Sequence, residues 1–111
     1  MNTDLDNWKT QIRKGYLELC LLRIIQQRKR IYGLELLENL QRLNLSTKEG
    51  TLYPILNRLT VDGILSAVWE TENVKGHPRK FYSLTKEGNR MLSVMESEFE
   101  NMIVIFKKLE N

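Results

Sequence analysis

Residues 46–65 read Ser-Thr-Lys-Glu-Gly-Thr-Leu-Tyr-Pro-Ile-Leu-Asn-Arg-Leu-Thr-Val-Asp-Gly-Ile-Leu, and the rest of the chain can be interpreted around this stretch. Ser46 and Glu49 have the spacing of a capping box, in which each side chain accepts a hydrogen bond from the other residue's backbone N–H. Gly63 follows the last apolar turn, where a left-handed residue commonly ends a helix. We therefore predict a helix over residues 46–61, with Pro54 kinking or tightening it. Its core-facing stripe would be Leu52, Ile55, Leu56 and Leu59.

The other face of this helix carries hydroxyl, amide, phenol and cationic groups, with no carboxylate after Glu49. Such groups can bond phosphate oxygens and base edges, and a helix fits the major groove of B-DNA. A face that is merely solvated would also be polar, so that alternative stays open. The residues concerned are Lys48, Thr51, Tyr53, Asn57 and Arg58.

Length and composition indicate one globular domain with a small core. The chain has 111 residues, of which 41% are hydrophobic and 28% charged. The net charge of +3 is unevenly spread: residues 1–85 carry 13 Lys and Arg against 9 Asp and Glu, whereas residues 86–111 carry 4 against 5. The basic excess therefore lies in the part that contains the candidate recognition helix.

Several classes of protein do not fit the composition. The single cysteine, Cys20, excludes a disulfide within one chain and argues against a cysteine-based metal site. One histidine and no recognisable pair of carboxylates leave no catalytic residues, so we expect neither an enzyme nor a metal or cofactor. The first residues lack the pattern of a signal peptide and no stretch suits a membrane span. We expect a soluble, cytoplasmic protein.

Residues 4–28 are predicted to form a long helix with two apolar rows. A core-facing row would comprise Leu17, Cys20, Leu21, Ile24 and Ile25. Because a single small core covers only one row, the second needs another cover, such as a partner chain. The second row comprises Leu5, Trp8, Ile12, Tyr16 and Leu19.

Residues 31–43 are predicted to form the next helix, and a short turn at residues 44–45 joins it to the helix of residues 46–61. Helix, short turn and helix is the unit that places its second helix in the major groove. Tyr32 stands at the start of the first of these helices, where a helix N-terminus and a phenol can hold a phosphate. The preceding basic turn at residues 28–30 fits either a solvated loop or a phosphate contact.

After Gly63 the pattern changes to strands, which we expect at residues 64–71 and 79–85. Gly76 and Pro78 mark the turn between them. The resulting β-hairpin has a basic tip of Lys75, His77, Arg79 and Lys80. A hairpin packed against a helix-turn-helix is the winged helix-turn-helix architecture.

Residues 86–110 are predicted to form a last helix, capped by Thr85, with apolar residues at alternating steps of three and four. A terminal helix with this many apolar residues should be covered by a second copy of the chain, which would give a two-fold homodimer. We thus expect a mainly α protein with a small β-hairpin: a winged helix-turn-helix domain over residues 1–85 and a dimerisation helix over residues 86–111. The expected dimer residues are Leu5, Trp8, Ile12, Leu92, Met95, Phe99, Met102, Phe106 and Leu109.

With these motifs in view, the sequence resembles the PadR family of bacterial transcriptional regulators over residues 14–109. Four segments carry the resemblance in order: Tyr-Gly-Leu-Glu-Leu at 32–36, Gly-Thr-Leu-Tyr-Pro at 50–54 continuing as Leu-Asn-Arg-Leu at 56–59, Asp-Gly-Ile-Leu at 62–65, and Gly-His-Pro-Arg-Lys-Phe-Tyr-Ser-Leu-Thr at 76–85 followed by Gly88. The resemblance implies a dimeric winged-helix repressor that a small molecule releases from a promoter, often its own. With a single helix after the wing, the chain resembles the short branch, which includes multidrug sensors. There a tryptophan of the last helix stacks on flat drugs, and here the matching residue is Phe99.

The resemblance and the residue patterns together give the candidate partner surfaces, with double-stranded operator DNA as the main partner. The candidate DNA-binding residues are Tyr32, Ser46, Thr47, Lys48, Gly50, Thr51, Tyr53, Pro54, Asn57, Arg58, Lys75, His77, Arg79 and Lys80. A small aromatic effector would bind Trp8, Ile12, Met95, Phe99 and Met102, which could equally be a packed dimer core. An alternative function is a winged helix used only for protein contact.

Overall fold

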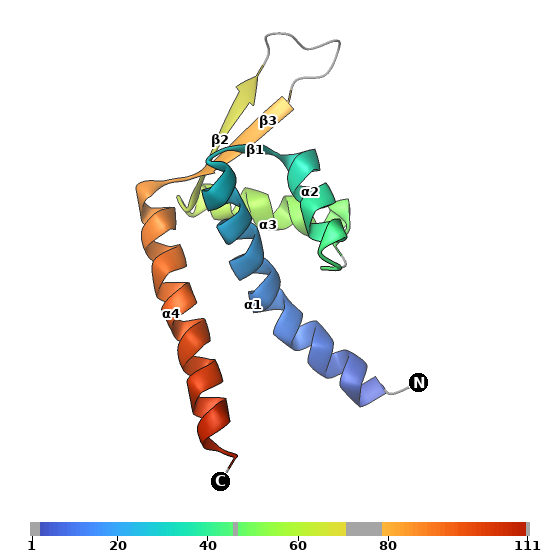
Figure 1. Cartoon of the computed structure of the whole chain (residues 1–111). Coiled ribbons are helices and arrows are strands. Elements are labelled where there is room, and N and C mark those ends of the chain that lie inside the picture. The colour runs from blue at the N-terminus through green and yellow to red at the C-terminus, as the bar shows by residue number, and fades with distance from the viewer. Residues whose placement is uncertain (1–2, 46, 71–78, 111) are drawn as a thin grey trace.

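The computed structural model describes residues 3–45, 47–70 and 79–110 (Figure 1). The winged helix-turn-helix followed by a long last helix agrees with the fold predicted from the sequence. Its elements are α1 (Thr3–Arg28), β1 (Ile31–Tyr32), α2 (Gly33–Arg42), α3 (Glu49–Val61), β2 (Leu65–Glu70), β3 (Arg79–Leu84) and α4 (Lys86–Lys108).

The sheet has a third strand, which the sequence pattern did not reveal. Strand β3 lies between β1 and β2 and pairs antiparallel with both. Ile31 pairs with Tyr82 and is fully buried, so the prediction of a helix from residue 31 is wrong. Tyr32 is extended, with φ −71° and ψ 149°, and α2 begins at Gly33. Pairing with β3 and burial of Ile31 outweigh the helical pattern of this segment, and β1 ties the base of the wing to the helices.

The core lies where the C-terminal half of α1, the helices α2 and α3, the sheet and the start of α4 meet. Each fully buried leucine or isoleucine there contributes roughly 1.5–3 kcal/mol by leaving water. Leu92 of α4 is fully buried in this core, so its assignment to the dimer surface is wrong. The buried apolar residues are Leu21, Leu22, Ile25, Ile31, Leu36, Leu37, Leu40, Leu52, Leu56, Leu59, Ile64, Leu65, Tyr82 and Leu92.

Two helix ends fix the path of the chain around the wing. Gly63 has φ 79°, as predicted for a left-handed residue at the end of this helix. Its N–H donates to Thr60 while the N–H of Ile64 donates to Leu59, which is a Schellman arrangement. Thr85 caps α4 as expected: its Oγ1 accepts from the N–H of Gly88 at 2.9 Å. These two ends bring the turn before β2 next to the start of α4, where the N–H of Thr85 donates to the Ile64 carbonyl at 3.1 Å.

Helices α1 and α4 extend beyond the core as two arms whose free ends point away from the wing (Figure 1). The radius of gyration is 16.2 Å, against about 13 Å for a compact chain of this length. Near the core the arms are joined by the Arg23–Glu96 ion pair, by a Gln26–Asn89 hydrogen bond and by the rings of Tyr16 and Phe99. No helix within residues 3–45, 47–70 and 79–110 is long and apolar enough to cross a membrane.

Candidate nucleic-acid interface

Helix α3 presents an uncovered face to solvent, as the sequence predicted. Leu52, Leu56 and Leu59 are buried on its inner side, while Asn57 and Val61 are exposed on the outer side. The helix begins at Glu49 with Lys48 as N-cap in extended conformation, and no side chain caps it. The prediction of a helix start at Ser46 with a capping box is therefore wrong, and Ser46 itself lies outside the described residues. Gly50 and Pro54 are also exposed, and the helix continues through Pro54.

Thr47 does not belong to the exposed surface. Its side chain is 3% exposed, its Oγ1 donates to the carbonyl of Leu45, and its own carbonyl accepts from Gln41 at 3.2 Å. The hydroxyl therefore closes the turn before α3 and is not available to DNA, which corrects its assignment as a contact residue.

The junction of β1 and α2 places Gly33 against Tyr53 of α3, with Tyr32 directly before it. The Tyr32 N–H donates to the Glu35 carboxylate at 3.3 Å, so the acidic side chain stabilises the start of α2. At the next position only glycine fits easily, because a Cβ on Gly33 would lie 2.8 Å from Cε1 of Tyr53. The Tyr-Gly pair thus lets the start of α2 approach the ring of Tyr53 closely.

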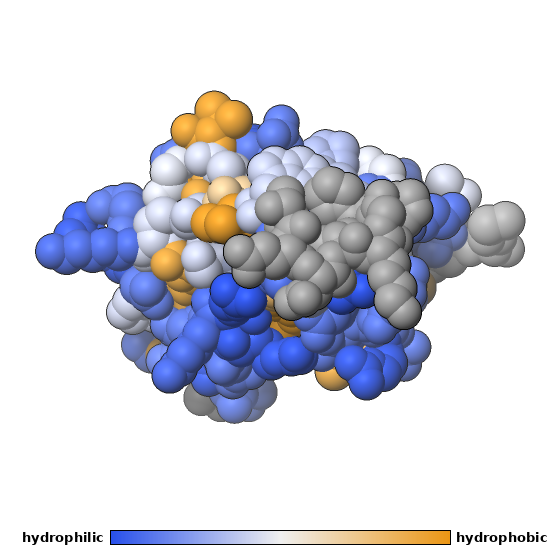
Figure 2. Space-filling model, turned by 90° about the horizontal axis from the view of Figure 1, so that it is seen from above, coloured by the Kyte–Doolittle hydropathy of each residue, from blue (hydrophilic) through white to orange (hydrophobic). Residues whose placement is uncertain are grey.

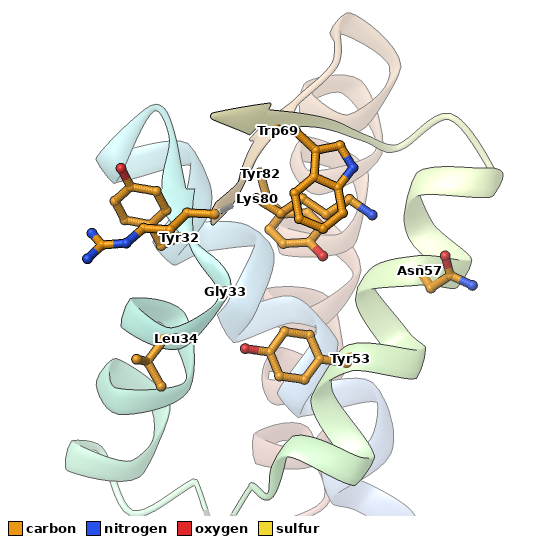
Figure 3. Close-up of a pocket in the computed structure, with 9 residues that line it drawn as sticks. Tyr32, Gly33, Leu34, Tyr53, Asn57, Trp69, Lys80 and Tyr82 are labelled. Atoms are coloured by element: carbon orange, nitrogen blue, oxygen red, sulfur yellow. The ribbon is translucent and has the colours of Figure 1, made fainter. Parts of the chain in front are cut away.

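Five predicted DNA-binding residues line one groove between the start of α2, helix α3 and the sheet. The groove has a volume of about 430 Å³, and we call it the wing-side groove. In Figure 3, Tyr53 extends from α3 toward the start of α2, below Trp69, Lys80 and Tyr82 of the sheet, while Asn57 lies further along α3 and is directed away from Tyr53. Its lining residues are Tyr32, Gly33, Leu34, Tyr53, Asn57, Trp69, Arg79, Lys80 and Tyr82.

Trp69 and Tyr82 are lining residues that the sequence analysis did not assign to the site. They lie on the same face of the sheet as Lys80, because Trp69 pairs with Lys80 and Tyr82 is two residues further along β3. The Lys80 ammonium lies 5.2 Å from the Trp69 ring centroid and 6.0 Å from that of Tyr82. Alternation along the two strands was the signal that could have placed these rings beside the lysine.

The opposite face of the sheet carries alternating cations and aromatic rings. Arg30 lies over Phe81 at 3.7 Å, Phe81 stacks on Tyr32 at 3.7 Å, and Arg79 lies 4.9 Å from the Tyr32 ring. Glu70 accepts from the Tyr32 hydroxyl at 3.1 Å and pairs with Arg30 at 3.6 Å. Arg30, treated from sequence as part of a basic turn, thus helps to fix Tyr32 and the base of the wing.

Two phenols of the wing-side groove, those of Tyr53 and Tyr82, stay protonated at neutral pH and can donate hydrogen bonds. Burial, followed by the charge of Glu49, raises the pKa of Tyr53. Burial, followed by the charge of Tyr53, raises the pKa of Tyr82. A neutral O–H donor beside Lys80 and Arg79 suits phosphate oxygens, which only accept hydrogen bonds.

Two other predicted residues of α3, Thr51 and Arg58, face helix α1 and not the wing. Thr51 and Arg58 line a second groove, of about 450 Å³, between α3 and α1, which we call the arm-side groove. Arg58 donates to Glu18 at 2.8 Å, and that carboxylate raises the pKa of the guanidinium. Arg58 therefore joins α3 to α1, and the predicted surface divides into two flanks of one helix. The lining residues are Thr10, Arg13, Lys14, Leu17, Glu18, Leu45, Thr47, Thr51, Ile55 and Arg58.

The wing end of the molecule is polar. Seen from above, hydrophilic and intermediate residues cover most of its described surface, and hydrophobic residues form small, separate spots (Figure 2). Such a surface suits a hydrated polyanion better than an apolar partner. The predicted contacts Lys75 and His77 lie outside the described residues.

The residues predicted for dimerisation and effector binding lie on the two arms. Trp8 and Ile12 of α1 and Met102, Phe106 and Leu109 of α4 are between 53% and 73% exposed. Leu5 is 44% exposed. Met95 is half-buried against the core, and Phe99 lines a groove of about 460 Å³ with Cys20 and Glu96. The other four effector candidates do not line that groove, so one protomer does not assemble the predicted effector site.

Comparison with known proteins identifies the family of this chain. The family model "Transcriptional regulator PadR-like family" matches residues 21–94. The transcriptional regulator Rv3488 of Mycobacterium tuberculosis is 38% identical over 63 residues, so the match spans 57% of this chain and 57% of that protein.

Solved structures match over nearly the whole chain. A PadR-like transcription factor from Bacteroides fragilis is 35% identical, with a TM-score of 0.79 over 93% of this chain and 98% of that one. A PadR family transcriptional regulator from Eggerthella lenta is 30% identical, with a TM-score of 0.84 over 96% of this chain and 93% of that one. The chain belongs to the PadR-like family of transcriptional regulators.

Proposed function

We propose that this DNA-binding regulator is a homodimeric repressor that inserts the α3 helix of each protomer into the major groove of an operator. Membership of the family makes it a transcriptional regulator and not an enzyme. The observation that carries the proposal is that Tyr32, Tyr53, Asn57, Arg79 and Lys80, from three elements, all line the wing-side groove, with Tyr32 and Arg79 contributing from the other face of the sheet. These are cations and hydrogen-bond donors placed beside an exposed helix face.

Roles within this surface follow from chemistry. Lys80 and Arg79 neutralise phosphates, with Lys48 adding charge at the start of α3. Tyr32, Tyr53 and Thr51 supply hydroxyl groups, and Asn57 an amide, for ordered polar contacts. Gly50 and Pro54 leave the outer face of α3 free of bulky side chains, which favours close approach to the groove floor.

The dimer is inferred from the exposed apolar residues of the two arms. Phe106 is 70% exposed, Leu109 73% and Trp8 57%. Contact of so much apolar surface with water is unfavourable for an isolated protomer. A two-fold partner would cover both arms and place two α3 helices on one face of the DNA. The half-sites would then lie about 10 base pairs apart, or a multiple of that distance.

Effector release is the second part of the proposal. Trp8 and Ile12 from one protomer, with Met95, Phe99 and Met102 from its partner, would line an apolar pocket at the dimer axis for a planar molecule. Binding there would change the angle between the winged domains and the spacing of the α3 helices. Trp8 fluorescence in a Trp69→Phe variant should change on addition of planar aromatic compounds. A constant signal across a broad panel would indicate a solid dimer core.

Fluorescence anisotropy tests the DNA-binding surface. The probes are the DNA immediately upstream of the protein's own gene and a scrambled duplex of the same composition, at several salt concentrations. We expect tighter binding to the native DNA. We also expect Lys80→Ala to weaken both complexes equally and, because the dimer carries this lysine twice, to lower the salt slope by about 1.8. An effect of Lys80→Ala confined to one operator base would contradict its phosphate role. Weak, salt-insensitive binding to both probes would favour a winged helix that contacts only proteins.

A further inference from the structure

Helix α1 has a cationic face that does not contribute to the core and has no role in the DNA-binding or dimer surfaces proposed above. Thr10, Arg13, Lys14 and Leu17 are spaced by three and four residues and all line the arm-side groove beside α3. Arg13 and Lys14 are both exposed, and within the described ranges neither forms an ion pair. The nearby carboxylate of Glu18 is already taken by Arg58 at 2.8 Å. The two cations therefore add an uncompensated positive charge next to the recognition helix.

The apolar row of α1 lies on a different side of the helix from the two cations. At 3.6 residues per turn, the row of Leu5, Trp8, Ile12 and Tyr16 is roughly half a turn from Lys14 and roughly a quarter turn from Arg13. A partner that covers the apolar row therefore leaves Arg13 and Lys14 facing α3. The cationic face is compatible with the proposed dimer.

A helix in the major groove is flanked by phosphates on both sides. The helix is about 10–12 Å across with its side chains and the groove about 12 Å wide, so each edge of the helix lies close to one DNA strand. The wing-side groove provides Arg79 and Lys80 for one strand. On the other edge of α3, Thr51 lies in the arm-side groove, and the only cation of α3 there, Arg58, is paired with Glu18.

We propose that Arg13 and Lys14 of α1 bind the DNA phosphates along the second edge of α3, so that each recognition helix is held between the wing and α1. This inference rests on the proposed DNA-binding mode and extends it to a helix outside the helix-turn-helix. The contact is with phosphate, so it adds affinity without sequence preference. Its partner is the same operator duplex and not a separate anionic ligand.

The test uses the full chain with Arg13→Gln, Lys14→Gln and the double substitution. Glutamine is a good helix former, so α1 should remain intact, which circular dichroism and urea unfolding would verify. The matched control is Lys107→Gln with Lys108→Gln at the far end of α4, which removes the same charge. Anisotropy is measured on the upstream and scrambled duplexes between about 50 and 300 mM salt, a range in which phosphate contacts give a clear slope.

Because the bound dimer carries each residue twice, we expect each single variant to lower the slope of log affinity against log salt by about 1.8, and the double variant by about 3.6, on both duplexes. The α4 control should keep the slope of the unmodified protein. An unchanged slope in the double variant, or an equal fall in the α4 control, would overturn the role of Arg13 and Lys14 while leaving the wing-side contacts standing. A salt-independent unmodified protein would overturn both proposals.

Discussion

At the scale of single residues, the wing-side groove depends on a missing side chain. A Cβ at Gly33 would meet the Tyr53 ring at 2.8 Å, and because the ring is on a partly exposed side chain it can swing aside. We therefore expect Gly33→Ala to cost little stability, about 1 kcal/mol, but to move the Tyr53 hydroxyl and weaken DNA binding roughly fivefold.

A double-mutant cycle with Tyr53→Leu isolates this effect. If Gly33 acts through the ring, Gly33→Ala should have a much smaller effect on affinity in the Tyr53→Leu background. Anisotropy on the upstream duplex measures all four proteins. Equal losses in both backgrounds would show that Gly33 matters for another reason.

Burial of the Tyr82 phenol makes the stability of the fold depend on alkaline pH. Burial and then the charge of Tyr53 raise the pKa of Tyr82 above that of the unfolded chain, which is about 10. Its contribution to stability is therefore fully present below pH 10 and is lost as the pH rises through the folded-state pKa. We expect the unfolding temperature to fall more steeply above pH 10 in the unmodified protein than in Tyr82→Phe. Parallel curves for the two proteins would contradict this assignment.

At the scale of elements, the first turn of α4 is held against the turn between α3 and β2 by close backbone contact. A Cβ on Gly88 would lie 2.1 Å from the carbonyl oxygen of Ile64, and backbone cannot yield as a side chain does. We expect Gly88→Ala to destabilise the fold by about 3 kcal/mol or more in urea unfolding. Gly15→Ala is the control, because nothing lies within 4 Å of its Cβ and alanine favours a helix by about 0.5–1 kcal/mol. Similar effects of the two substitutions would refute the close-contact argument.

The elements that the sequence predicted correctly are those with local causes. Periodicity and capping gave α1, α4, Thr85 and the Gly63 turn, since each depends on neighbours within a few residues. Strand β1 could not be predicted, because two residues become a strand only when β3 lies beside them. The Ser46 capping box had the right spacing, but α3 starts at Glu49 and Thr47 is buried.

In the candidate site too, the features with local causes could be predicted and those that depend on tertiary contacts could not. The sequence identified the polar face of α3 and the cations of β3, but it could not tell that Tyr53 and Asn57 face the wing while Thr51 and Arg58 face α1. That distinction depends on how α3 lies between two other elements, which a single helical pattern does not encode. The pairing of Arg58 with Glu18, 40 residues away, is likewise a tertiary contact.

At the scale of the whole molecule, the two arms of an isolated protomer expose large apolar side chains to water. Substituting one of these side chains tests the proposed dimer. In a two-fold interface Phe106 contributes twice, so Phe106→Glu should cost roughly 4 kcal/mol and raise the dimer dissociation constant about 10³-fold. Analytical ultracentrifugation should show monomers at concentrations where the unmodified chain is dimeric.

The control is Val61→Glu, which places the same charge on the equally exposed outer face of α3. It should stay dimeric yet bind DNA weakly, because the carboxylate would face the phosphates. A Phe106→Glu protein that stays dimeric would place the interface elsewhere, and the spacing of the two α3 helices would then have to be set by other surfaces.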